Sequence, residues 1–230
     1  MNLRLTAHLL LRSAQDLLHG TKFARKRTPQ ALPHTLRLSQ PFKPSQTLEQ
    51  KKQNLSLAAR RIGQYTLAPG ETFSFWRAVG NPNTPQFACS RSIVAGTLKL
   101  ERGGGLCQAS GIIYHLALLA GLEIVERYAH SVDLYTEEMR FCPLGSDATV
   151  AYGYRDLRIR NNTDALLRFE LSVADTEFHA RLCSSLPIAS KAISFSHTTL
   201  PDGRRQAIAV DNATGAVLTT DTYAVFTEHA

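Results

Sequence analysis

Cys107 has the side chain and the setting in this sequence that best suit covalent chemistry. It follows Gly103, Gly104 and Gly105 and precedes an apolar pattern of helical spacing over residues 110–120. At the start of a helix, free N–H groups and the positive end of the dipole stabilise an anion, so the thiol pKa should fall. The glycines leave an open approach for a substrate carbonyl. The pattern predicts a nucleophile, with a small apolar residue packed between helix and loop as the alternative.

His130 is the expected partner of this thiol. Residues 122–128 alternate as a strand does, directly after Gly121 ends the helix. A helix of about fourteen residues is about 20 Å long, so an antiparallel strand beside it returns His130 to the level of Cys107. His115 lies about 12 Å further along the helix axis and is predicted to be a partly buried helix residue. For His130 itself, the alternative is an ordinary core or loop histidine.

A third polar group commonly orients such a Cys–His pair, and three aspartates follow His130 closely. Asp133 continues the same strand or turn, and Asp147 opens the next run. Asp156 falls within residues 148–160, which are predicted to form one long strand. We favour Asp156, because a carboxylate inside a strand needs a partner more than one at a turn does. The alternatives are that Asp147 is a turn residue and that Asp156 pairs with a surface arginine, so the third position stays open.

Several separate motifs occur in order along the chain: Pro69–Trp76, Gly103–Gln108, Leu119–Arg127 with His130-Ser131, and Ala148–Leu157. Together they resemble the VanW family, which is named after an accessory protein of vancomycin resistance clusters. The resemblance covers roughly residues 50 to 183. Many members have a second histidine two residues before the His-Ser pair, where this chain has Tyr128.

The order of elements is also similar to the core of transglutaminase-like cysteine hydrolases, in which a helix-borne cysteine is followed by a strand, a histidine and an aspartate. This similarity implies that Cys107 is the nucleophile, His130 the base, and Asp156 or Asp147 the orienting group. By analogy, the reaction would be acyl transfer or hydrolysis at an amide, such as one in a peptidoglycan stem peptide or its precursor.

Two classes of function fit these residues. The first is a cysteine-dependent acyl-transfer enzyme or amidase, in which Gln108 or the N–H of Cys107 stabilises an oxyanion. The second is a non-catalytic binding or accessory protein, in which the glycine loop and the helix N-terminus hold a carboxylate or phosphate. Ser131, next to His130, is a further binding candidate in either case.

The composition bounds the class of protein. With 230 residues, 43% of them hydrophobic, the chain is long enough to bury one good core. Its cysteines are widely and irregularly spaced, so reduced thiols are expected; they are Cys89, Cys107, Cys142 and Cys183. We expect no cofactor, and a zinc site built from Cys107, His130 and Cys142 is a remote alternative.

Residues 1–45 are predicted to be an extension, with a basic amphipathic helix at residues 2–19 and a proline-containing linker. Basic side chains at residues 22–27 contribute to a net charge of +7. Residues 2–27 could contact an anionic membrane surface, although packing on the chain's own domain is the commoner outcome. We find no signal peptide or spanning segment and expect a cytoplasmic protein, free or at the inner membrane surface. No motif indicates a nucleic-acid partner.

The remaining pattern predicts an α+β fold, in which the cysteine-bearing helix packs on a mainly antiparallel sheet. A second helix is expected at residues 48–62, and strands or hairpins at residues 72–76, 92–100 with a turn at Gly96, 165–173, 177–183 and 207–218. Residues 46–185 would form the VanW-like domain. Residues 186–230 would add a C-terminal β-hairpin extension that completes its sheet.

Overall fold

The computed structural model describes residues 3–28, 30–94, 97–133 and 140–225, and its central element is helix α4 (Leu106–Leu119). Ten of the fourteen residues of α4 are buried. The helix begins after Gly105, which has a φ of 93°, and Gly121, with a φ of 66°, follows its end. Because glycine adopts positive φ without strain, these two residues delimit the helix that carries Cys107.

The main sheet is antiparallel and packs against α4. Its strands lie in the order β10 (Leu167–Val173), β11 (Glu177–Ser184) and β2 (His34–Pro41). Helix α2 (Leu48–Ile62), at the bounds that its sequence pattern predicts, contacts both β10 and α4. The core therefore lies between the main sheet and these two helices.

Smaller sheets surround this core, and a short helix α3 (Phe75–Val79) follows one of their strands. Two of them pair β1 (Arg25–Lys26) with β3 (Tyr65–Thr66) and β5 (Cys89–Val94) with β6 (Thr97–Arg102). The third has the order β4 (Thr72–Ser74), β9 (Arg158–Arg160) and β7 (Glu123–Glu126). The expected turn at Gly96 lies outside the described residues, but β5 and β6 pair antiparallel on either side of it.

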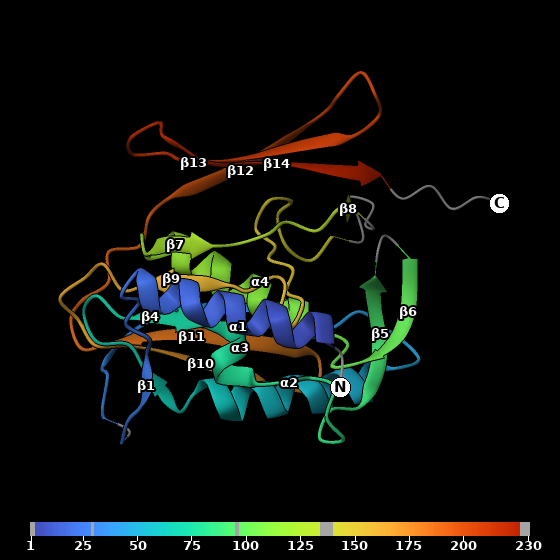
Figure 1. The fold of residues 1–230 in the computed structure, drawn as a ribbon. Helices are drawn as coiled ribbons and strands as arrows, with labels where there is room; N and C mark the ends of the chain where they lie inside the picture. The colour runs from blue at the N-terminus through green and yellow to red at the C-terminus, as the bar shows by residue number, and fades with distance from the viewer. Residues whose placement is uncertain (1–2, 29, 95–96, 134–139, 226–230) are drawn as a thin grey trace.

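The C-terminal strands form a sheet of their own. Its order is β12 (Ile193–Thr199), β13 (Arg205–Asp211), β14 (Val217–Val225) and β8 (Val132–Asp133), with β8 parallel to β14. The expectation that this segment completes the main sheet is therefore wrong. Figure 1 shows the C-terminal sheet on one side of α4 and the main sheet with α2 on the other. The predicted α+β class is confirmed.

Residues 148–160 do not form the long strand that their alternation predicts. Only β9 is a strand, and a turn at residues 152–154 is closed by a bridge between Ala151 and Arg155. Gly153 has a φ of 83°, which interrupts the extended backbone, and a β-carbon there would lie 2.3 Å from Leu5 Cδ1. The turn therefore lies between Asp147 and Asp156, the two candidates for the third position.

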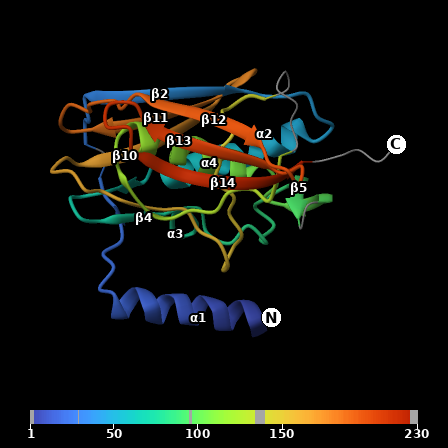
Figure 2. The same ribbon diagram turned by 90° about the horizontal axis from the view of Figure 1, so that it is seen from above.

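Helix α1 (Leu3–Leu18) lies along one side of the molecule (Figure 2), and Leu5, Arg12 and Asp16 lie on the face that contacts it. On that face Arg12 pairs with Glu126, and Asp16 pairs with Arg158. No described residue of α1 is buried. None of the helices in the described ranges combines the length and the hydropathy needed to cross a membrane.

The glycine loop before α4 is packed tightly against its neighbours. A β-carbon on Gly104 would lie 2.4 Å from the carbonyl oxygen of Ser90 in β5. Asn54 of α2, which is buried, donates a hydrogen bond of 3.0 Å to the Gly104 carbonyl. The glycines therefore permit close backbone packing, which fixes the position of Cys107, instead of the open approach that the sequence suggested.

Replacing Gly104 by alanine should lower the free energy of unfolding by about 3 kcal/mol, because the added methyl group meets main-chain atoms that cannot move independently. Urea denaturation measures this loss. Gly63→Ala is the matched control, since Gly63 has helical angles (φ −61°, ψ −12°) and should change the unfolding free energy by less than about 1 kcal/mol. Equally small effects of the two substitutions would contradict the tight packing at Gly104.

Candidate functional site

The structure brings Cys107, His130 and Asp147 together beside the start of α4. Asp147 Oδ2 accepts hydrogen bonds from His130 Nδ1 at 2.6 Å and from the His130 backbone N–H at 2.7 Å. Because Nδ1 is engaged, Nε2 is the ring nitrogen left for the Cys107 thiol, and the imidazole lowers the pKa of that thiol. The three side chains form a continuous thiol–imidazole–carboxylate series.

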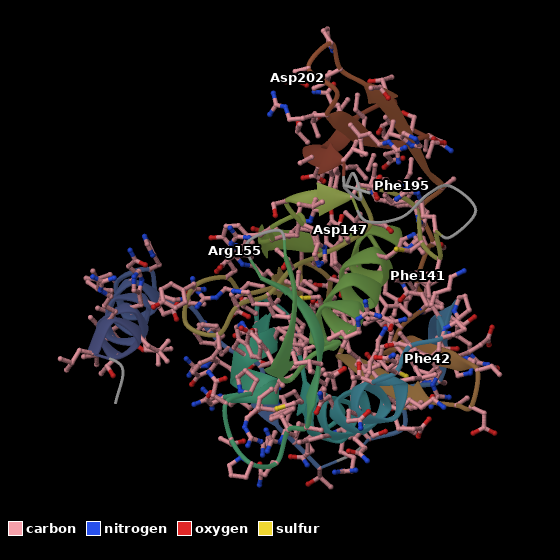
Figure 3. The ribbon with its side chains drawn as sticks, turned by 90° about the vertical axis from the view of Figure 1, so that its right-hand side faces the viewer. Phe42, Phe141, Asp147, Arg155, Phe195 and Asp202 are labelled. Carbon is pink, nitrogen blue, oxygen red and sulfur yellow. The ribbon has the colours of Figure 1, made fainter. Side chains whose placement is uncertain are left out.

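The segment that carries Asp147 crosses the first turns of α4. Ser110 Oγ donates a hydrogen bond of 2.6 Å to the Ala148 carbonyl. The Thr149 N–H donates to the Tyr128 carbonyl at 2.8 Å, and Thr149 Oγ1 lies 3.7 Å from Cys107 Sγ. One short segment therefore contacts the cysteine helix and the residues before His130. Figure 3 shows Asp147 between α4 and the C-terminal sheet.

Asp147 is also held by two residues outside the series. Its Oδ1 accepts hydrogen bonds from Tyr223 Oη at 2.5 Å and from Arg127 Nη2 at 3.2 Å. Arg127 in turn pairs with Asp221, and its guanidinium lies 4.7 Å from the Tyr114 ring centroid. Since Asp221 and Tyr223 belong to β14, the C-terminal sheet contributes directly to the positioning of Asp147.

The electrostatics favour an ionised thiol. Burial alone would raise the pKa of Cys107, but the hydrogen bond to His130 and its positive charge bring that pKa below its usual value. Burial would likewise lower the pKa of His130, whereas Asp147 and Cys107 raise it to about 10. Burial would raise the pKa of Asp147, but His130 and Arg127 lower it to about 2. These shifts favour a thiolate beside an imidazolium and an ionised Asp147.

The site is partly open to solvent. Cys107 is half-buried, and the side chains of His130 and Asp147 are 25% and 17% exposed. A thiol with a lowered pKa and partial exposure has the properties of a reactive cysteine.

Asp156, the favoured third residue, lies elsewhere. It is buried and accepts hydrogen bonds from Ser74 Oγ at 2.5 Å and from the Trp76 N–H at 3.1 Å, and Arg158 Nε lies 3.3 Å away. These contacts join it to the start of α3 and not to His130. Asp133 is also buried, and it pairs with Arg140 and Arg205. Of the three aspartates, Asp147 is the one beside the imidazole.

Gln108 lies next to Cys107, but its backbone N–H already donates to the Gly105 carbonyl at 2.9 Å. The Cys107 N–H has no acceptor among the described residues and remains a first-turn donor beside the thiol. Gln108 Oε1 is buried and has no hydrogen-bond partner in the part of the chain that the structure describes. Ser131 is exposed, and its carbonyl accepts a hydrogen bond from the Ala224 N–H.

The other cysteines have different surroundings. Cys89 is exposed, Cys183 is buried, and burial raises the pKa of Cys142 to about 11. Across the described ranges, no group of three or more His, Cys, Asp or Glu side chains could hold a metal ion, the combination of Cys107, His130 and Cys142 included.

His115 is half-buried on α4, and its ring centroid lies 5.3 Å from that of Phe195. Burial lowers the pKa of His115 to about 4, so this histidine is neutral at physiological pH. It faces β12 of the C-terminal sheet, and Cys107 lies two turns away along the helix.

Sequence reasoning missed Arg127, Asp221 and Tyr223. Arg127 and Asp221, which are hydrogen-bonded, are 94 residues apart in the sequence. Tyr223 and Asp147 are hydrogen-bonded across 76 residues. No local motif marks these residues, because their roles depend on how the C-terminal sheet packs. Sequence reasoning also missed Lys51, whose charge interacts with that of Cys107.

A family model described as "VanW like protein" matches residues 50–183, more than half of the 230 residues. The chain belongs to the VanW family. The matched region contains the glycine loop, α4, His130 and Asp147, but it ends before β14. Tyr223, which donates to Asp147, and Asp221, which pairs with Arg127, therefore lie outside the region that the VanW model matches.

Two VanW relatives share this region. The vancomycin B-type resistance protein VanW of Enterococcus faecalis is 36% identical over 129 residues, which make up 55% of this chain and 46% of that protein. The uncharacterized protein YoaR of Bacillus subtilis is 37% identical over 121 residues, 51% of this chain and 38% of that protein. The chain thus spans less than half the length of these curated relatives.

No solved structure matches this VanW-family chain. The similarity to the transglutaminase-like core therefore stays a prediction from the order of elements. Tyr128, where many VanW members have a second histidine, is exposed, and the Arg155 guanidinium lies 5.5 Å from its ring centroid.

Substituting Asp147 by asparagine should slow the alkylation of Cys107 by iodoacetamide at pH 7 by about tenfold, because an imidazolium without its carboxylate loses its proton more readily and supports the thiolate less. The rate is measured by quenching the alkylation at timed intervals and quantifying the Cys107 peptide by mass spectrometry. The pH at which the rate is half-maximal should rise.

Asp156→Asn is the matched control and should leave the alkylation rate within about twofold of the wild type, since Asp156 contacts α3. Circular dichroism should first establish that both variants fold. A loss of thiol reactivity in Asp156→Asn, with none in Asp147→Asn, would contradict the geometry of the site.

Proposed function

We propose that this VanW-family chain is a cysteine-dependent acyl-transfer enzyme or amidase that acts on a peptide-like substrate. The observation that carries the proposal is the Cys107–His130–Asp147 series, in which the hydrogen bonds and charges favour a thiolate paired with an imidazolium. A nucleophile, a proton donor beside it and a group that orients the donor are the parts that thiol-based acyl transfer requires.

In the first step, the Cys107 thiolate attacks the carbonyl carbon of an amide, and a C–S bond forms as the carbonyl electron pair moves to oxygen. The Cys107 N–H and the positive end of α4 stabilise that oxyanion. His130 Nε2 then gives its proton to the leaving nitrogen as the C–N bond breaks. The products of this step are an amine and a thioester on Cys107.

In the second step, an acceptor attacks the thioester, and neutral His130 takes a proton from it. The C–S bond breaks and the thiolate forms again. An amine acceptor gives acyl transfer, and water gives hydrolysis. Throughout, Asp147 keeps His130 Nδ1 protonated and the ring oriented.

The substrate to test is a peptidoglycan stem peptide or its precursor, which the analogy with transglutaminase-like hydrolases suggests. The tight packing of the glycine loop supports an enzyme over an anion-binding accessory protein, because Gly103 and Gly104 are buried and leave their backbone little room for a ligand.

Incubation with muropeptides should add the mass of an acyl group to the Cys107 peptide, as measured by mass spectrometry after acid quenching. Cys107→Ala should abolish the adduct, and His130→Ala should slow its formation by about a thousandfold, because the thiolate and the proton donor are both lost. Cys142→Ala removes a half-buried thiol outside the series and serves as the control. An adduct that persists in Cys107→Ala would contradict the proposal.

We also propose that α1 lies on an anionic membrane surface, which the sequence predicts through residues 2–27. Five leucines are exposed on the side of α1 that faces away from the body, with exposures of 62% to 84%: Leu3, Leu10, Leu11, Leu17 and Leu18. Arg4 on the same helix and Lys22 and Arg25 beyond its end are exposed cations. An apolar stripe bordered by cations is typical of interfacial helices. The cytoplasmic location stays a prediction.

Leu10→Glu should weaken binding to vesicles that contain phosphatidylglycerol by about tenfold. The substitution removes a leucine that would be buried in the membrane and adds a negative charge that the anionic lipids repel. Co-sedimentation measures the bound fraction. Gln15→Glu makes the same change of charge at an exposed position off the leucine stripe and should have the smaller effect. Wild-type protein that stays in the supernatant with these vesicles would refute this placement of α1.

A further inference from the structure

Lys51 of α2 approaches the reactive end of α4 from the side of the glycine loop. A β-carbon on Gly105 would lie 2.5 Å from Lys51 Cγ and 3.3 Å from Cε, so the lysine stem lies directly against the residue before α4. Cys107 follows two residues later, and the Lys51 ammonium is close enough for the two charges to interact.

The position of this ammonium is defined by packing. Gly105 borders its stem on one side, and Lys51 Nζ lies 5.8 Å from the ring centroid of Phe42, which Figure 3 labels beside α2. Lys51 is half-buried, and burial lowers its pKa while the charge of Cys107 opposes the decrease. A cation held in this way is less hydrated than a free surface lysine and interacts more strongly with an anion.

No carboxylate of the described residues forms an ion pair with Lys51, whereas the next lysine, Lys52, pairs with Glu49 at 3.1 Å. Cys107 in its ionised form is the group whose charge raises the pKa of Lys51 against the effect of burial. Acylation of Cys107 removes this charge, because a thioester is neutral. In the acyl-enzyme, Lys51 would then be a half-buried cation without a neighbouring anion from the protein, unless the substrate provides one.

We infer that Lys51 binds a carboxylate of the substrate close to the carbonyl that Cys107 attacks, and so selects peptide-like substrates with an acidic group beside the reacting amide. The inference rests on the proposed function and assigns a substrate feature to the same site. Lys51 acts here as a specificity residue, through charge attraction and a hydrogen bond to the carboxylate.

Two alkylating reagents of similar size test this assignment without a known substrate. Iodoacetate carries a carboxylate beside the carbon that the thiolate attacks, and iodoacetamide carries a neutral amide at the same position. The ratio of their rates at Cys107 reports the local attraction for a carboxylate. A change in the pKa of the thiol affects both reagents alike and cancels in the ratio.

Lys51→Met keeps an unbranched stem against Gly105 and removes the charge, so it should lower the iodoacetate-to-iodoacetamide ratio about fivefold or more. Lys51→Arg should retain most of the wild-type ratio. Lys52→Met is the matched control, because it removes the neighbouring positive charge on the same helix, and it should leave the ratio unchanged. If Lys51→Met does not fold, added salt should lower the ratio in the wild-type protein.

The outcomes separate this inference from the proposed function. An unchanged ratio in Lys51→Met, or in salt, overturns the role of Lys51 even if Cys107 remains highly reactive. An equal decrease in Lys52→Met also overturns it, because the effect would then come from the net charge of the helix. A Cys107 that reacts no faster with iodoacetamide than an ordinary thiol contradicts the proposed function, whatever the ratio.

Discussion

The carboxylate of Asp147 is the group on which the arrangement of the site depends. It accepts four hydrogen bonds, two from His130, one from Arg127 and one from Tyr223. These donors come from the region after β7 and from β14, so one carboxylate joins segments distant in sequence. A carboxylate removed from water needs such partners to remain ionised, and each donor would have a weaker acceptor if Asp147 were neutral. The same hydrogen bonds that keep Asp147 ionised therefore also orient the His130 ring.

This carboxylate also links the C-terminal sheet to α4. Arg127 contacts Asp147, Asp221 and the ring of Tyr114, so a single guanidinium connects the Asp147 segment, β14 and the central helix. Burial alone would lower the pKa of Arg127, but Tyr114 and the two carboxylates raise it above the usual value. The C-terminal sheet is therefore part of the construction of the site, although the matched VanW region ends at residue 183.

Features that depend on local pattern could be predicted from the sequence. The apolar spacing of α4 and the glycines at its two ends place Cys107 in the first turn, and α2 has the predicted bounds. The choice between Asp147 and Asp156 could not be predicted, because alternation alone does not reveal that Gly153 turns the chain back. Lys51 and Tyr223 could not be found either, since their positions follow from tertiary packing.

The long sequence separation between Asp147 and β14 has a consequence for folding. The bond from Tyr223 to Asp147 closes a loop of 76 residues, and contacts of such separation form late because the entropy of a long loop must be lost first. Before then, Asp147 lacks one of the donors that hold it, and the imidazole is less firmly oriented. The thiol of a partly folded chain therefore keeps a more ordinary acidity. The lowered pKa of this thiol thus depends on contacts that the complete fold supplies.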